Sequence, residues 1–397
     1  MFSGRIISAT GYSIVMPFLA IYLNGELDVG MGAVGLLFLG MALTGALGQI
    51  VGGELSDRVG RRPMLWLPMG LRGLVFLSLF IAMALSGNIW LTSGLILCSS
   101  FLGTLFEPAS NAMIADIVEP GRRMEGYSIL RVGQNAGWTL GPIISGMMLT
   151  VLPFHWLFVV AGLSNIAAGA VVFLMIAEPQ RSVQGDRFRV SDLLRLGRNS
   201  LFIVLCLASI PLFIVLGQLT STFAVFSSQD LQVDVATVGW LYALNGIMVV
   251  FLQMPMARYI ARFRMPYVLA AGAMMYAAGY LVMGWASGIW FLVAAIVITS
   301  LGENTVSPSA MNMVADLSPE KERGRYMGAY GIFSTFGWSM GPAVGGVLYD
   351  LFHLDPVVLW GCIAAIAMIG ALGFVYLGRL AAGSHDRAPG PSARKAG

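Results

Sequence analysis

Charged residues are scarce in this sequence. Only 11% of its 397 residues are Asp, Glu, Lys or Arg, whereas 57% are hydrophobic. Soluble globular proteins carry about a quarter charged residues, so this composition excludes a soluble globule and indicates an integral membrane protein. The net charge of +3 does not point to a nucleic-acid partner, because the arginines are already accounted for as markers of membrane topology.

Cysteine and histidine are scarcer still. The three Cys and three His residues lie in separate segments, without the spacing of a disulfide framework or a metal site. We therefore expect free thiols packed between helices, no bound metal and no cofactor. The sequence also lacks a Gly-rich phosphate loop that ends in Lys-Ser or Lys-Thr. We do not expect an enzyme, and any work the protein does must be driven by a gradient or by a partner.

Long hydrophobic runs are abundant. Apolar segments of about twenty residues, the length that crosses a hydrocarbon core of about 30 Å, follow one another along the chain. There are twelve: 2–23, 33–53, 64–85, 89–117, 127–152, 155–177, 200–227, 236–257, 266–285, 289–317, 325–350 and 356–378. The predicted fold is all-α and integral to the membrane, with twelve transmembrane helices.

Basic residues are confined to alternate connections. Almost all of the 23 Lys and Arg residues follow an even-numbered segment or lie in the tail, and the intervening connections carry acidic residues only. Basic loops stay cytoplasmic, so we predict a multi-pass protein of the cell (inner) membrane with both termini inside. No cleavage-site pattern follows the first segment, so a removed signal peptide is not expected. Arg5 is expected at the interface or facing protein, and a start upstream of Met1 stays open.

The second part of the chain repeats the first at an offset of 200 residues. The Gly-Trp and Gly-Pro pairs within 137–142 recur within 337–342. Two parallel six-helix halves around a central cavity are the arrangement expected of a secondary transporter. The predicted organisation is an N-terminal half (1–177), a cytoplasmic central loop (178–199), a C-terminal half (200–378) and a cytoplasmic tail (379–397).

A basic turn follows the second segment and reads Gly-Glu-Leu-Ser-Asp-Arg-Val-Gly-Arg-Arg-Pro over residues 53–63. A glycine at its start permits close helix approach, Asp57 can cap a helix or pair across the two halves, and Gly60 supports a tight turn. The arginines hold the turn at the anionic inner leaflet. The candidate gating residues are Gly53, Asp57, Arg58, Gly60, Arg61 and Arg62. The alternative is a basic turn placed by topology alone.

The fifth segment has glycine at every fourth position together with a Gly-Pro pair. These residues are Gly133, Gly137, Gly141, Pro142 and Gly146. Such glycines form a groove that lets another helix approach closely, and the proline bends its helix. Small-residue grooves also occur in many packed membrane proteins, so the pattern alone does not define a function.

The 53–63 turn resembles the helix 2–3 signature of the major facilitator superfamily, Gly-x-Leu-x-Asp-Arg-x-Gly-Arg-Arg. The glycine pattern of the fifth segment is similar to the antiporter signature of the drug:proton antiporter branch of that superfamily. The resemblance spans the whole chain in helix count, repeat and central loop. It implies a transporter whose first, fourth, seventh and tenth helices line the cavity.

Two carboxylates lie deep in predicted helices. Glu107 precedes Asp116 by nine residues and Glu303 precedes Asp316 by thirteen, which places them about 14 Å and about 20 Å from the inner end at helical rise. An ionised carboxylate at this depth is expensive, so such a group binds either a proton or a cation. We predict that both couple protons to substrate. The alternative is a carboxylate neutralised by a structural partner, Arg72 or Arg131.

Other polar groups complete the candidate site. Arg72 lies too deep for easy snorkelling and is expected to pair with an acid or with carbonyl groups in a structural role. The uncharged candidates for the substrate site are Tyr12, Asn111, Gln218 and Asn304. Asp116 is expected to join the cytoplasmic charge cluster of the 53–63 turn, and Asp316 to do the same with Arg325. Ordinary helix-end capping is the alternative.

These observations together predict a monomeric secondary transporter. It exports small, lipophilic or cationic compounds in exchange for protons by alternating access. One alternative keeps the fold but carries a sugar or metabolite, as an exporter or a symporter. Another is a membrane receptor or assembly partner that transports nothing.

Overall fold

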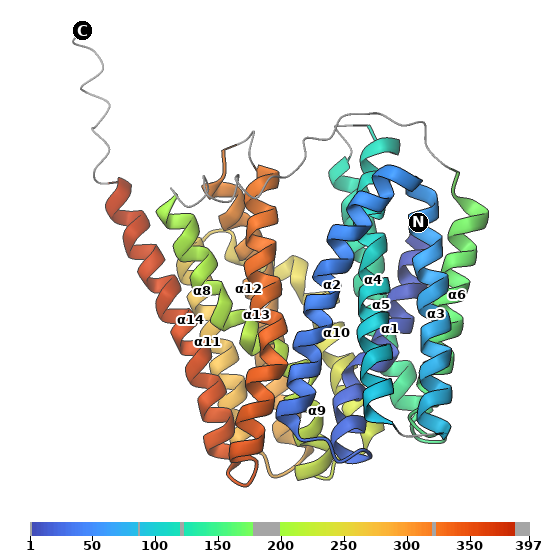
Figure 1. Cartoon of the computed structure of the whole chain (residues 1–397). Helices are drawn as coiled ribbons and strands as arrows, with labels where there is room; N and C mark the ends of the chain where they lie inside the picture. The colour runs from blue at the N-terminus through green and yellow to red at the C-terminus, as the bar shows by residue number, and fades with distance from the viewer. Residues whose placement is uncertain (1, 86–87, 120–122, 178–198, 320–322, 386–397) are drawn as a thin grey trace. The chain divides into compact units, whose positions relative to one another are not determined.

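Figure 1 shows the computed structural model, which describes residues 2–85, 88–119, 123–177, 199–319 and 323–385. Side chains are described for these residues except 115, 123–128, 131, 323–325 and 383–385. Helices connected by short turns make up this part of the chain, and it contains no strand. Residues 178–198 of the predicted central loop and the end of the tail lie outside the described residues.

Six helices form the first part of the chain. They are α1 (Phe2–Gly25), α2 (Met31–Val59), α3 (Arg61–Leu85), α4 (Ile89–Ile117), α5 (Arg123–Met148) and α6 (Trp156–Met175). The second part contains α8 (Ser200–Leu216), η2 (Gly217–Thr220), α9 (Thr222–Val225), η3 (Phe226–Asp230), α10 (Val235–Ile260), α11 (Met265–Gly284), α12 (Ile289–Leu317), α13 (Arg323–Phe352) and α14 (Pro356–His385).

Each predicted transmembrane segment corresponds to a helix. The seventh is a broken one, in which α8, η2, α9 and η3 together make the single span Ser200–Asp230. Within the described ranges, ten helices are long and apolar enough to cross a membrane. The remaining two, α5 and α13, carry the polar, glycine-rich stretches of the predicted fifth and eleventh segments. The all-α, twelve-helix prediction is therefore confirmed.

The described chain divides into two compact units. The first contains α1–α6 together with Gln218–Gly246 and Pro342–His353. The second contains α8 with Gly217, Ile247–Gly341 and the last helix, α14. The boundary between the units falls within α10 and again within α13, so each of these helices contributes residues to both units.

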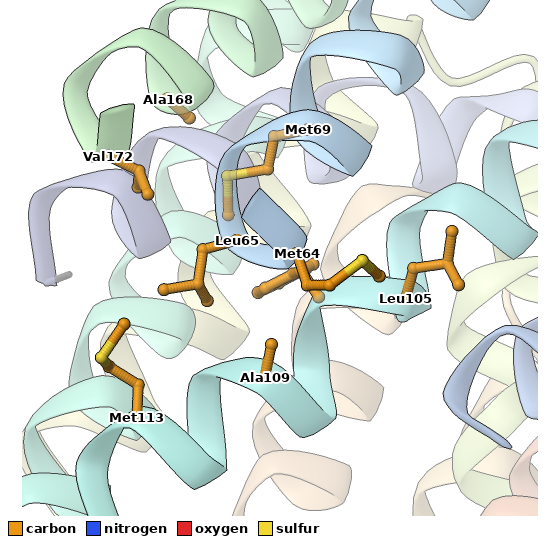
Figure 2. Packing of buried hydrophobic residues seen from close by; sticks show 9 residues of the cluster. Met64, Leu65, Met69, Leu105, Ala109, Met113, Ala168 and Val172 are labelled. Atoms are coloured by element: carbon orange, nitrogen blue, oxygen red, sulfur yellow. The ribbon is translucent and has the colours of Figure 1, made fainter. Parts of the chain in front are cut away.

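A hydrophobic cluster joins α3, α4 and α6 in the first unit (Figure 2). Its members are Met64, Leu65 and Met69 of α3, Leu105, Phe106, Ala109 and Met113 of α4, and Ala168 and Val172 of α6. The unbranched, flexible methionine side chains fill the irregular space between the branched and aromatic ones. This packing fixes α4 on α3, and so fixes the two helices that supply the deep polar residues of the first unit.

Glycines bring α1 and α5 into close contact. A methyl group at Gly137 would lie 2.8 Å from the carbonyl oxygen of Ile6, and one at Gly141 would lie 2.7 Å from the backbone of Ser13. The approach lets the Ser13 hydroxyl donate a hydrogen bond to the Gly137 carbonyl at 2.8 Å. The groove predicted from the glycine pattern is thus filled by α1, the helix that lines the candidate cavity.

The close approach of α2 to α4 uses other glycines than the predicted one. Gly48 and Gly52 lie against the backbone carbonyls of Phe101 and Leu105, where no side chain fits. A methyl group at Gly53 would lie 3.8 Å from Pro108, which is an ordinary contact. Gly53 was therefore the wrong residue for this role, because it lies one residue beyond the face of α2 that meets α4.

The second unit repeats the packing of the first. A methyl group at Gly337 would lie 2.8 Å from the carbonyl oxygen of Ile210, and one at Gly341 would lie 2.7 Å from that of Ile214. Here α13 meets α8 as α5 meets α1. The repeat that was visible in the sequence as Gly-Trp and Gly-Pro pairs thus corresponds to a repeated helix contact.

Candidate functional site

A cavity of about 140 Å³ lies within the first unit, lined by α1, α3, α4 and α5. Its lining contains three charged and three large aromatic side chains: Arg5, Arg72, Glu107, Tyr12, Phe106 and Trp138. Small polar groups and Gln134 complete it. A space that holds charged groups among aromatic rings is the kind of site that binds a small molecule inside a membrane protein.

Arg5 and Glu107 form an ion pair in this cavity. Arg5 Nη1 lies 2.8 Å from Glu107 Oε1, and Arg5 Nη2 donates a hydrogen bond to Gln134 Oε1 at 2.6 Å. The Arg5 side chain is only 10% exposed, and its guanidinium lies over the Phe106 ring at 4.9 Å. Removing one member of a buried ion pair typically costs about 3–5 kcal/mol. Arg5, expected at the interface or facing protein, therefore faces protein as the partner of Glu107.

The carboxylate of Glu107 is shared between the protein and the cavity. Its side chain is 29% exposed, and its one ion pair with a described residue is made by Oε1. The neighbouring Arg5 Nε is buried and has no hydrogen-bond partner in the part of the chain that the structure describes. This pair is thus held in place but incompletely satisfied, which leaves room for a proton or a ligand group to change its partners.

Arg72 is the second guanidinium of the cavity. It is 6% exposed, lies over the rings of Tyr12 and Phe76 at 4.4 and 5.2 Å, and donates a hydrogen bond from Nε to Ser99 Oγ at 3.3 Å. Gly103 of α4 makes room for it, since a methyl group there would lie 2.7 Å from Arg72 Nη1. Among the described residues Arg72 makes no ion pair; Glu107 interacts with it electrostatically at longer range, and two aromatic faces make the close contacts.

Tyr12 links the two guanidinium sites. Its ring meets Trp138 of α5 edge to face, with centroids 5.6 Å apart and an interplanar angle of 76°, while its face lies under Arg72. Arg5, Ser8 and Tyr12 recur at the spacing that places residues on one face of a helix. Tyr12 and Glu107 were predicted for the site from the sequence, whereas Arg5 and Trp138 were not, although the helical spacing of Arg5 and Tyr12 is visible in α1.

Two other predicted site residues of the first unit do not line the cavity. Asn111 is exposed one turn beyond Glu107. Gln218 is fully buried at the break between α8 and α9, where its Oε1 accepts a hydrogen bond from Thr222 Oγ1 at 2.8 Å and the side chain packs against Gly345. Gln218 therefore stabilises the irregular backbone of the seventh span.

Glu303 and Asn304 belong to α12 of the second unit. Glu303 is half-buried and close enough to the Tyr276 hydroxyl for an electrostatic interaction. Asn304 is 1% exposed, and its Nδ2 donates a hydrogen bond to the Ser300 carbonyl at 2.9 Å. Its Oδ1 is buried without a hydrogen-bond partner among the described residues. The structure thus places the two predicted carboxylates in different units.

The turn between α2 and α3 is organised by Arg61. Gly60 ends α2 with a φ of 120°, a left-handed conformation that favours glycine. Arg61 then reaches back to Asp57 Oδ1 at 2.7 Å and across to Asp116 Oδ2 of α4 at 3.3 Å, and it donates a hydrogen bond to Ser56 Oγ at 2.9 Å. Asp57 pairs within its own turn, and Asp116 lies in the same charge cluster.

The other gating candidates have separate surroundings. Arg58 pairs with Glu54 on the exposed face of α2. Arg62 donates a hydrogen bond to the Phe173 carbonyl at 2.6 Å and lies over the Phe173 ring at 4.9 Å, which ties α3 to α6. Asp316 is exposed at the end of α12, and the side chain of Arg325 lies outside the described residues.

No group of three or more His, Cys, Asp or Glu side chains that would hold a metal ion occurs among the described residues. The three cysteines have free thiols.

The described residues form helices and short turns, with ten apolar helices that could span a membrane, a packing repeat and a charged cavity, and these are the features of a membrane transporter. The model of the Major Facilitator Superfamily matches residues 1–228 and 212–396, and the chain belongs to that family. Transporters of this family bind small-molecule substrates within the membrane.

Relatives and solved structures agree with this assignment. The chain is 26% identical over 383 residues to the MFS-type transporter YqjV of Bacillus subtilis (strain 168), covering 94% of this chain and 92% of the relative. It is 28% identical over 373 residues to the multidrug resistance protein MdtH of Proteus mirabilis (strain HI4320), covering 92% and 89%. The resemblance to the superfamily and its multidrug branch is confirmed, at low identity.

The fold is shared with solved transporters. The nucleoside transporter NupG is similar with a TM-score of 0.80 and 12% identity, covering 95% of this chain and 97% of that one. The peptide transporter POT in complex with sulfate is similar with a TM-score of 0.73 and 19% identity, covering 96% and 93%. At these identities the similarity concerns the fold alone.

Proposed function

We propose that this protein exports small, lipophilic or cationic compounds in exchange for protons, by alternating access. In this proposal it acts as a monomer in the inner (cell) membrane, with both termini in the cytoplasm. Residues 1–177 and 200–378 act as two six-helix halves, joined by the 178–199 loop and followed by the 379–397 tail. The multidrug names of the relatives support the substrate class.

The ion pair between Arg5 and Glu107 is the observation that carries the proposal. A proton on Glu107 cancels the charge that holds Arg5, and a cationic group of a substrate competes with that proton for the same carboxylate. Proton and substrate then bind in exclusive states, which is the thermodynamic requirement for exchange of one for the other. The 29% exposure of the Glu107 side chain leaves it reachable from the cavity.

The body of the cavity supports a lipophilic substrate. Tyr12, Phe106 and Trp138 present aromatic rings on three different helices. Aromatic faces bind delocalised cations and flat ring systems with little geometric demand. A site of this kind accepts related molecules of different shape, which suits export of many compounds.

The charge cluster around Arg61 is proposed as one gate. Asp57, Arg61 and Asp116 connect α2, α3 and α4 at one end of the first unit. A contact that forms in just one of the two states of an alternating-access cycle shifts the balance toward that state. Asp316 and Arg325 are proposed to act equivalently in the second half, and Glu303 to be the second proton-binding carboxylate.

The proposal is tested by measuring protons released on binding. Purified protein in weakly buffered solution is mixed with the lipophilic dye rhodamine B, and the pH is followed. The measurement is repeated from progressively more acidic starting pH values, and we expect wild-type protein and the matched variant Glu119→Gln, altered at an exposed carboxylate beyond α4, to release protons once the starting pH is low enough for Glu107 to carry one. We expect none from Glu107→Gln.

A second variant protects this test against misfolding. Glu107→Gln leaves Arg5 buried and unpaired, so Arg5→Gln with Glu107→Gln removes both charges together. Dye binding without proton release by either variant supports the proposal. Unchanged proton release by a variant that lacks Glu107 would contradict it.

A further inference from the structure

The cavity carries an excess positive charge. Its lining contains two guanidinium groups and one carboxylate. Arg5 and Glu107 form an ion pair at 2.8 Å, whereas Arg72 makes no ion pair with any described residue and interacts with Glu107 only at longer range. An uncompensated charge inside a membrane protein is expensive, and such groups mark sites where substrates or ions bind.

The surroundings of Arg72 hold the charge without cancelling it. The faces of Tyr12 and Phe76 attract the guanidinium through their ring quadrupoles, and Ser99 accepts one hydrogen bond from it. Gly103 allows the planar group to lie against the backbone of α4. These contacts involve two helices besides α3, so they fix the direction of the guanidinium. A positive charge that is built in and oriented in this way is suited to recognise an anionic group.

We propose that the cavity takes amphoteric substrates, with an acidic group bound by Arg72 and a cationic group of the same molecule facing Glu107. Guanidinium and carboxylate form two parallel hydrogen bonds in a planar arrangement, which gives both affinity and orientation. The aromatic rings of Tyr12 and Trp138, which meet at 5.6 Å, suit a flat ring system between the two charged ends.

This inference rests on the proposed function, because it names the substrate class of the exchange site. A purely cationic ligand leaves Arg72 without a counter-charge. A purely acidic ligand binds best when Glu107 is protonated, and proton and ligand would then move together. A molecule with both charges places an acidic group against Arg72 and a cationic group that competes with the proton on Glu107.

The test compares two dyes that differ at one group. Rhodamine B has a delocalised cationic ring system and a carboxylate, and in its ethyl ester the carboxylate is blocked. Binding of each to purified protein is measured by fluorescence polarisation. We expect wild-type protein to bind the acid about tenfold tighter than the ester, or more, as for a hydrogen-bonded charge pair. Arg72→Gln should bind both dyes with the affinity that wild type has for the ester.

The same substitution elsewhere provides the control. Arg258→Gln, at the end of α10 in the second unit, should keep the full preference for the acid. If Arg72→Gln does not fold, Arg72→Lys decides: an ammonium lacks the planar fork, so the preference should fall several-fold while ester binding is unchanged. The proposal is overturned if wild type binds the two dyes equally or does not bind the acid. It is also overturned if the Arg72 variants keep the full wild-type preference for the acid over the ester.

The outcome is separate from that of the proposed function. Equilibrium binding needs no proton gradient. If the acid is preferred in a way that depends on Arg72 but binding releases no proton, the proposed coupling is overturned and the acidic-group site stands. Proton release with equal binding of both dyes overturns the acidic-group site and keeps the coupling.

Discussion

Asp350 of α13 caps the first turn of α2 at Met31. The Met31 backbone N–H donates a hydrogen bond to Asp350 Oδ1 at 2.8 Å, and that of Gly32 donates one to Oδ2 at 2.7 Å. The first turn of a helix has unpaired N–H groups and a partial positive charge, so a carboxylate there satisfies both. The contact joins segments 318 residues apart within the first unit. Gly346 keeps the two helices close, because it lies against the Met31 carbonyl.

Asp350→Asn is expected to loosen this end of α2. Loss of the carboxylate at a helix N-terminus costs about 1 kcal/mol. This corresponds to about a fivefold shift from the form in which α2 and α13 are in contact toward the form in which they are apart. A cysteine at the fully buried Met31, in a background without the native cysteines, should react about fivefold faster with an impermeant maleimide. Asp355→Asn removes the carboxylate that caps α14 instead and should leave the rate unchanged. Equal maleimide reaction rates in the two variants would show that the Asp350 contact does not stabilise the packing of α2 against α13.

The orientation in the membrane is checked by the same chemistry. A cysteine at Asp355 should react with an impermeant reagent added to intact cells, because acidic connections are predicted to face outward. A cysteine at Arg189, in the predicted central loop, should react only after the cells are opened. Labelling of position 189 in intact cells would reverse the proposed orientation.

The charge cluster of the α2–α3 turn should respond unequally to its two acids. Asp57 is 59% exposed and Asp116 only 12%, and exposed ion pairs contribute at most about 1 kcal/mol. We expect Asp57→Asn to slow turnover modestly and Asp116→Asn to slow it more, with dye affinity within a few-fold of wild type in both. Steady-state transport and binding are measured together. Glu54→Gln, which alters only an exposed pair, is the control, and a large loss of affinity in Asp116→Asn would argue against a gating role.

The glycine contact of α1 with α5 should tolerate no side chain. Gly137→Ala places a methyl group 2.8 Å from the Ile6 carbonyl, and overpacking of this kind costs about 1–3 kcal/mol. Gly94→Ala in α4 meets nothing within 4 Å and should be neutral or slightly stabilising. Thermal unfolding of the purified variants distinguishes the two. Equal melting temperatures would mean that the helices can separate at no cost.

The sequence predicted the parts of the fold that depend on composition and periodicity. The twelve predicted segments each correspond to a helix, counting the broken seventh as one, and the Gly-Trp and Gly-Pro repeat became equivalent contacts at Gly137 and Gly337. The break of the seventh span at Gly217–Thr220 was not predicted, because hydropathy averages over local backbone geometry. Gly53 was predicted from the motif, and the roles of Gly48 and Gly52 were missed, because a motif indicates a position but not which face of α2 meets α4.

The site was harder to predict than the fold for a physical reason. The depth of a charged group follows from its position in a helix, so Glu107 and Arg72 were identified as buried. The partner of a charge depends on which helices are neighbours, and Arg5 near the chain start gave no sign of its contact with α4. Aromatic compensation of Arg72 by Tyr12 and Phe76 likewise requires knowing the packing of α1 on α3.

The most direct test of the account measures proton-driven transport by the double variant that carries both Glu107→Gln and Glu303→Gln. Glutamine keeps the size and most hydrogen bonding of glutamate but cannot change charge, so the substitution isolates proton binding. In proteoliposomes with an imposed pH gradient, wild type should accumulate rhodamine B above empty liposomes until an ionophore collapses the gradient. The double variant should accumulate none, while exchange of dye for dye, which needs no net proton release, continues. Full gradient-driven accumulation by the double variant would contradict proton coupling through these carboxylates.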